Sequence, residues 1–114
     1  MPRDYKVFLE DILEAIRKIR DYTGGLSLQA FTADERTFDA VVRNLEIIGE
    51  AVKQIPEDTR SLRPEVEWKR IGRLRDILIH EYFGVDVRIV WDLVQSKLAP
   101  PEQAVRTLLE IALR

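Results

Sequence analysis

The 114-residue chain contains no cysteine and a single histidine, His80. Without cysteine it can form neither a disulfide nor a thiolate metal site. With one histidine it also lacks the several His or Cys ligands that a zinc site usually requires. We therefore expect no metal and no cofactor. The absence of cysteine fits a reducing compartment, and a cytoplasmic protein is expected.

The sequence also lacks a long apolar run. A membrane-spanning helix requires about 20 predominantly apolar residues, and charged residues interrupt every apolar stretch of this chain. The N-terminal sequence MPRDYKVFLEDILEAI is interrupted in the same way, so we expect no secretory signal peptide. The sequence predicts no contact with a membrane.

Apolar residues make up 46% of the chain, which is enough for the core of one domain over residues 1–114. They recur at spacings of three and four, which predicts helices and no strands. Five helical stretches are expected: about 4–22, about 34–54, about Trp68 to near Tyr82, one after Asp86 that carries Val90 to Leu98, and one opened by Pro100 that carries Val105 to Ala112. The predicted fold class is all-α, an up-and-down antiparallel bundle of four to five helices.

Several residues predict where these helices begin and end. The first should end at Thr23-Gly24-Gly25, and either Thr32 or Asp34 can cap the second. Pro56 should stop the second helix and open a turn-rich segment over residues 56–67. Asp86 can cap the fourth.

Positive charge is concentrated in one segment, although the net charge of the chain is −2. Residues 60–80 hold 6 Lys or Arg and 3 Asp or Glu, whereas residues 1–59 hold 8 and 12. A local basic patch on an acidic protein can bind a phosphate chain. A solvated, salt-bridged surface explains the same pattern.

The basic segment ends in RDILIHEY, residues 75–82, which contains the single histidine. Each residue of a helix turns about 100° around the axis. On one continuous helix this rotation gathers a core stripe of Ile71, Leu74, Ile77 and Leu78. It gathers a separate polar face of Lys69, Arg73, Asp76 and His80. His80 is therefore not expected in the core.

The polar face can support acid–base chemistry. Asp76 and His80 are four residues apart, so the carboxylate can fix the imidazole tautomer and leave its other nitrogen free for proton transfer. Arg75 lies near Tyr82 in angular position around the helix axis. Its planar guanidinium group suits a phosphate or a carboxylate. An ordinary surface pair of Asp76 and His80, and a Tyr82 ring that packs on the bundle, are the structural alternatives.

The combined pattern resembles the HepT-type toxins, small all-α proteins of the HEPN superfamily. It is carried by R-x-x-x-x-H-x-Y at Arg75, His80 and Tyr82, by Asp76 after the arginine, and by the strings NLEIIGEAVKQIP at 44–56, WKRIGRLRDILIHEYFGVD at 68–86 and VW at 90–91. The resemblance covers nearly the whole chain.

The resemblance implies a metal-independent endoribonuclease toxin that works as a homodimer, with its cleft between two copies of the motif helix. It implies a partner, an MntA-like nucleotidyltransferase antitoxin that silences the toxin by transferring AMP from ATP to Tyr82. The alternative is a non-catalytic protein that binds nucleotides or serves as a scaffold for a nucleotidyltransferase.

The resemblance also implies roles for single residues. Arg75 would hold the scissile phosphate, His80 would transfer protons, and Asp76 would orient His80. Three further cations could follow the RNA backbone or could be ordinary solvated side chains: Lys69, Arg70 and Arg73.

Three other residues of the matched strings have structural interpretations. Trp68 and Trp91 are expected to pack in the bundle rather than stack on bases. Glu50 could brace a basic residue across the bundle or across a dimer, or it could be a plain surface carboxylate.

Overall fold

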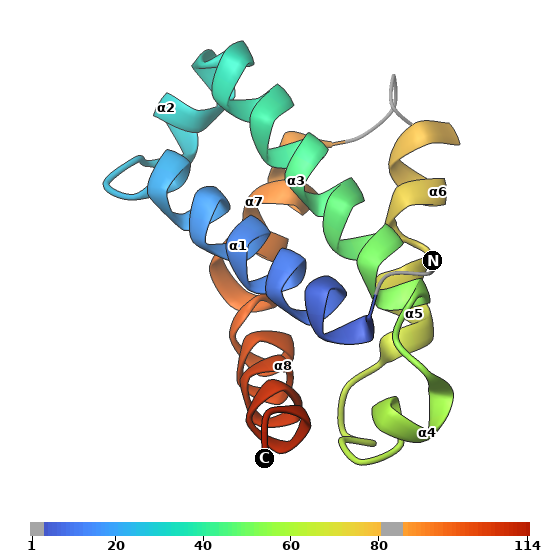
Figure 1. The fold of residues 1–114 in the computed structure, drawn as a ribbon. Coiled ribbons are helices and arrows are strands. Elements are labelled where there is room, and N and C mark those ends of the chain that lie inside the picture. The colour runs from blue at the N-terminus through green and yellow to red at the C-terminus, as the bar shows by residue number, and fades with distance from the viewer. Residues whose placement is uncertain (1–3, 81–85) are drawn as a thin grey trace.

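The computed structural model describes residues 4–80 and 86–114, apart from the side chains of Arg75, Ile79 and His80. The regular structure in this part of the chain is entirely helical (Figure 1), which confirms the predicted all-α class. The helices are α1 (Tyr5–Thr23), α2 (Leu28–Ala33), α3 (Glu35–Lys53), α4 (Glu57–Arg60), α5 (Trp68–Gly72), α6 (Leu74–His80), α7 (Val87–Ser96) and α8 (Ala99–Ala112). None of the helices in the described ranges combines the length and the hydropathy that a membrane-spanning segment requires.

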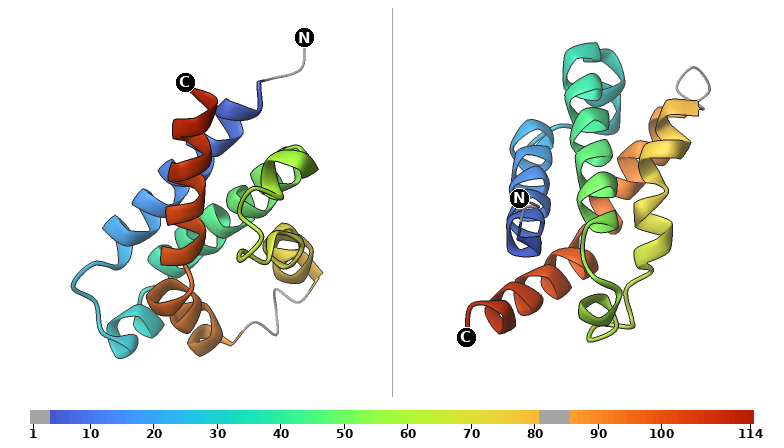
Figure 2. Two further views of the ribbon diagram at one scale, coloured as in Figure 1. Left: turned by 90° about the horizontal axis from the view of Figure 1, so that it is seen from below. Right: turned by 45° about the vertical axis from the view of Figure 1, so that its right-hand side comes forward.

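The two longest helices, α1 and α3, lie side by side in the middle of the molecule (Figure 1). The segment α5–α6 lies along the C-terminal half of α3, and α8 crosses α1 obliquely (Figure 2). The side chains between these helices are apolar and almost fully buried; among them are Leu9, Ile12, Ile16, Ile19, Val41, Leu45, Val52, Leu78, Val105 and Leu108. The central pair therefore supports the motif segment on one side and the C-terminal helix on the other.

The ends of the long helices follow the capping residues in the sequence. The carboxylate of Asp34 accepts a hydrogen bond from the backbone N–H of Thr37 at 3.1 Å and so caps α3. After α1 the chain turns at Gly25, whose φ of 80° is a conformation that glycine adopts without strain. Asp86 caps α7 by accepting from the N–H of Arg88 at 2.9 Å. These three ends confirm the prediction from sequence.

Helix α2 was not expected. Ser27 caps it by accepting from the N–H of Ala30 at 3.1 Å, and Phe31 is fully buried within it. The ring centroids of Phe31 and Trp91 lie 5.0 Å apart, which confirms the packing role expected for Trp91. Thr32 does not cap α3, because its hydroxyl donates to the carbonyl of Leu28 inside α2. Six residues are too few for an apolar period to appear in the sequence.

The third expected helix is divided, so the prediction of one continuous helix from Trp68 was wrong. A turn at Arg73 separates α5 from α6. Gly72 precedes the turn, and glycine lowers helix stability by about 1 kcal/mol relative to alanine. The end expected near Tyr82 and Gly84 lies outside the described residues.

The turn-rich segment contains the short helix α4. Helix α8 begins at Ala99 with prolines in its first turn, as expected.

Candidate functional site

The backbone positions of Arg75, Asp76 and His80 all lie in α6. The turn at Arg73 precedes all three, so their relative spacing is that of one helix. Asp76 and His80 stand one helical turn apart, as the proposed pairing of carboxylate and imidazole requires. Tyr82 lies outside the described residues.

Contacts on one side of α6 fix it against the bundle. Leu78 is buried in the core, and Trp68, at the start of α5, is buried as well. The indole Nε1 of Trp68 donates to the carbonyl of Arg63 at 3.0 Å, which satisfies its polar group. Trp68 is therefore a packing residue, as predicted.

Ile77 departs from the predicted core stripe, because 44% of its surface is exposed. Leu74 and Ile71 are only half-buried, and Leu78 alone of this predicted stripe is fully covered. The reason is geometric: Leu78 faces the core, and Ile77 lies about 100° around the axis of α6 from it. The structure therefore presents an exposed apolar side chain next to Asp76.

Asp76 lies off the core, as expected, and 52% of its side chain is exposed. Its Oδ2 lies 3.6 Å from Nζ of Lys53, the last residue of α3. The same ammonium group lies 3.7 Å from Oε1 of Glu50, so Glu50 faces a basic residue on its own helix. Sequence analysis did not single out Lys53, because only the packing of α3 on α6 brings it to Asp76.

The three cations proposed to follow RNA are exposed but lie outside α6, the helix that carries His80. Lys69 and Arg70 lie in α5, and Arg73 is the turn residue between the helices. Arg70 is paired with Glu67 at 3.2 Å, and both side chains are largely exposed. The turn at Arg73 invalidates the single helical wheel on which Lys69 and Arg73 shared a face with His80. Lys69, Arg70 and Arg73 are therefore exposed side chains of the segment that directly precedes α6.

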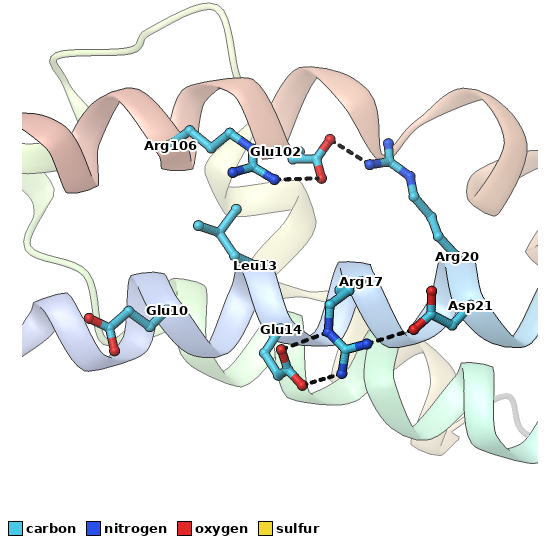
Figure 3. A pocket seen from close by; sticks show the side chains of 8 residues that line it. All are labelled: Glu10, Leu13, Glu14, Arg17, Arg20, Asp21, Glu102 and Arg106. Atoms are coloured by element: carbon cyan, nitrogen blue, oxygen red, sulfur yellow. Dashed lines mark hydrogen bonds and ion pairs between the residues drawn. The ribbon is translucent and has the colours of Figure 1, made fainter.

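A hollow of about 440 Å³ lies elsewhere, between α1 and α8 (Figure 3). In it Arg17 forms hydrogen bonds of 2.6 Å with both Glu14 and Asp21. Glu102 lies between two cations, 2.5 Å from Arg20 and 3.6 Å from Arg106. Each of these arginines is therefore already matched by a carboxylate.

The arginines and the carboxylates of this hollow pair with one another. The hydrogen bonds from Arg17 hold the pKa of the Glu14 carboxyl below its ordinary value. The same bonds raise the pKa of Arg17, so both groups stay charged. Residues of α6 do not line the hollow. Within residues 4–80 and 86–114, no group of three or more Asp, Glu or His side chains is placed to hold a metal ion.

The family model described as "Ribonuclease HepT-like" matches residues 12–108, which include α6. A protein of Thermococcus cleftensis named "Probable ribonuclease HepT" is 49% identical over 86% of this chain and 89% of its own length.

Two further relatives carry the name "Putative RNase". One, from Methanocaldococcus jannaschii, is 48% identical over 86% of this chain and 82% of its own length. The other, from Caldanaerobacter subterraneus, is 41% identical over 96% of this chain and 95% of its own length. No solved structure matches the chain significantly. The extent of the family match and these identities show that the chain belongs to the HepT-like family of ribonucleases.

Proposed function

We propose that this protein is a metal-independent endoribonuclease whose reacting groups lie on α6. The observation that carries the proposal is the placement of Arg75, Asp76 and His80 on one short helix of a HepT-like fold. Asp76 lies on the exposed side of that helix, one turn before His80. The protein acts in the cytoplasm on RNA.

The proposed reaction requires two proton transfers and no metal. A base removes the proton of a ribose 2′-hydroxyl, and the 2′-oxygen attacks the adjacent phosphorus. The bond from phosphorus to the 5′-oxygen breaks, and an acid protonates that leaving oxygen. The products are a 2′,3′-cyclic phosphate and a free 5′-hydroxyl. Arg75 binds the phosphate and stabilises its added charge, and Asp76 orients His80.

One histidine per chain supplies only one of the two proton-transfer groups, so the proposed active species is a homodimer. In a two-fold dimer, His80 of one copy serves as base and His80 of the other as acid. The exposed Ile77 supports this arrangement, because an apolar side chain beside the proposed reacting groups gains stability when a second copy covers it. Light scattering should give about twice the monomer mass of 13.3 kDa. A monomer that cleaves RNA at micromolar concentration would contradict the composite site.

We include regulation in the proposal. A nucleotidyltransferase antitoxin transfers AMP from ATP to the Tyr82 hydroxyl and releases pyrophosphate. The new phosphodiester carries a negative charge two residues from His80, where it competes with the RNA phosphate for Arg75. Intact-mass and peptide spectrometry after co-expression should find AMP on Tyr82. Neutralisation without modification would instead mean inhibition by tight binding.

The experiment that tests the function is RNA cleavage by purified protein in the presence of a strong chelator. Cleavage should persist, and the 5′ fragment should end in a 2′,3′-cyclic phosphate or its hydrolysis product. His80→Ala, purified in parallel, excludes a contaminating nuclease. If chelation abolishes the activity and magnesium restores it, His80 is not the central group. If wild-type protein binds nucleotides but cleaves no RNA, the alternative role as a nucleotidyltransferase partner is correct.

A further inference from the structure

Lys53 connects the central helix of the bundle with the motif helix. It is the last residue of α3, and its Nζ lies 3.6 Å from Asp76 Oδ2 on α6. The C-terminal part of α3 and α6 lie side by side in both views (Figures 1 and 2). Glu50, one turn earlier on α3, faces Lys53 at 3.7 Å. A basic side chain from a second helix therefore contacts the carboxylate that lies one helical turn before His80 along α6.

The side chain of Lys53 passes near Gly72. A Cβ atom at position 72 would lie 3.4 Å from Lys53 Cγ, 3.9 Å from Lys53 Cε and 3.9 Å from Val52 Cγ1. The alkyl stem of Lys53 thus passes close to Gly72 of α5 before the ammonium group reaches α6. Lysine stems commonly lie along a protein surface while the ammonium group reaches a polar partner.

We propose that Lys53 is a positioning residue that holds Asp76 and, through it, adjusts the acid–base strength of His80. The inference rests on the proposed function, in which His80 transfers protons. A carboxylate that faces only an imidazole favours the imidazolium ion. A cation that shares the carboxylate reduces this effect. The imidazole is then protonated less readily, so that one copy can be a base while the other is an acid.

Other charged groups lie on the helices beside Asp76. From α3 it is faced by Lys53, which is itself faced by Glu50. On α5, Lys69 and Arg70 are exposed, and Arg70 is paired with Glu67. Lys53 is exposed to solvent over 39% of its side chain, so its removal should leave the core intact. Methionine keeps the unbranched stem beside Gly72 and removes only the charge.

The single histidine makes the test direct, because NMR titration of the imidazole reports one residue without overlap. Lys53→Met should raise the His80 pKa by about 0.5, and Lys53→Arg should leave it near the wild-type value. In an Asp76→Asn background, Lys53→Met should change the pKa by less than half as much. Lys97→Met, at the exposed C-cap of α7, removes the same charge at a distance and should have no effect. Melting temperatures confirm folding.

Cleavage gives a second readout. The pH optimum of Lys53→Met should move upward by the same amount as the His80 pKa, while Lys53→Arg retains the wild-type profile. A His80 pKa that does not respond to Lys53→Met would overturn the inference. A response that is equally large in the Asp76→Asn background would mean a direct field effect and would overturn it as well. If wild-type protein fails to cleave RNA, the proposed function falls, but the titration still decides whether Lys53 acts through Asp76.

Discussion

Two charged surfaces of this molecule differ in how closely their charges are paired. In the hollow between α1 and α8, Arg17 and Arg20 lie 2.5–2.6 Å from their carboxylate partners (Figure 3). On the side of α3 and α6, the ammonium of Lys53 lies 3.6–3.7 Å from two carboxylates. Arg17 and Arg20 thus form short charge-assisted hydrogen bonds, whereas the two ion pairs of Lys53 are longer, as is the Arg106–Glu102 pair of the hollow.

The difference separates a charged surface that supports the fold from one suited to a ligand. Arginines that already hold carboxylates must give up those bonds before they bind a phosphate. Loosely paired groups and exposed cations can change partners at little cost. The hollow between α1 and α8 is therefore not the best candidate for the reaction. The surface of α6 is favoured, and the homodimer proposed above would supply the other side of its cleft.

The largest expected effect compares two arginines, one from each surface. Arg75→Ala should reduce RNA cleavage about 100- to 1000-fold, the range found when a group that stabilises developing charge is removed. Arg17→Ala removes an arginine from the hollow between α1 and α8 and should leave cleavage unchanged. Both variants should retain their helical circular dichroism. Equal losses of activity in Arg75→Ala and Arg17→Ala would contradict the inference that the reaction takes place at α6 and not at the hollow.

The second expected effect is on stability and concerns what attaches α8 to α1. Leu108 is 1% exposed, and Leu108→Ala should lower the free energy of unfolding by about 2–5 kcal/mol. Leu113, which is 66% exposed, is the matched control, and Leu113→Ala should have little effect. Urea unfolding measures both. If Leu108→Ala is as mild as the control, the ion pairs rather than apolar burial hold α8.

A smaller effect is expected from the ion pair that joins these two helices. The carboxylate of Glu102 is 2.5 Å from Arg20, whose side chain is 44% exposed. Pairs of this exposure stabilise proteins by about 0.2–1 kcal/mol. A double-mutant cycle with Arg20→Ala and Glu102→Ala should give a coupling energy in this range. The coupling should shrink at high salt, and a value that salt does not change would contradict a solvent-screened pair.

The smallest expected effect is the response of the same network to acid. Because Arg17 lowers the pKa of Glu14 in the folded protein, the carboxylate contributes stability above its ordinary pKa of 4.5. That contribution is lost as the pH falls below 4.5 and through the lower pKa of the folded state. The melting temperature of Glu14→Gln should therefore fall less steeply than that of wild type in this window. Arg17→Ala should flatten the same part of the curve.

The sequence was most informative where a local rule determines the structure. Asp34 and Asp86 cap their helices as predicted, because capping depends on residues within one turn. The prolines at the start of α8 act in the same local way. The helical period likewise predicted that Asp76 would lie off the core, and its exposed side chain agrees.

The sequence was less informative where tertiary packing decides. A helical period assigns Ile77 to an apolar stripe but cannot reveal how wide an arc α3 covers. The same limit hid Lys53, which is 23 residues from Asp76 along the chain and meets it only in the fold. Gly72 was the available signal for the turn at Arg73, because glycine weakens a helix at that point.

The length of α6 has a consequence for how the protein should respond to heat. Isolated helices shorter than about 12–15 residues are marginal in water, and α6 has seven residues. Its persistence therefore depends on α3, which contacts it along one side. We expect the amide protons of α6 to exchange with deuterium faster than those of α1 and α3. The proposed enzyme should then lose activity on warming by local melting of α6, at a temperature below that at which the bundle itself unfolds.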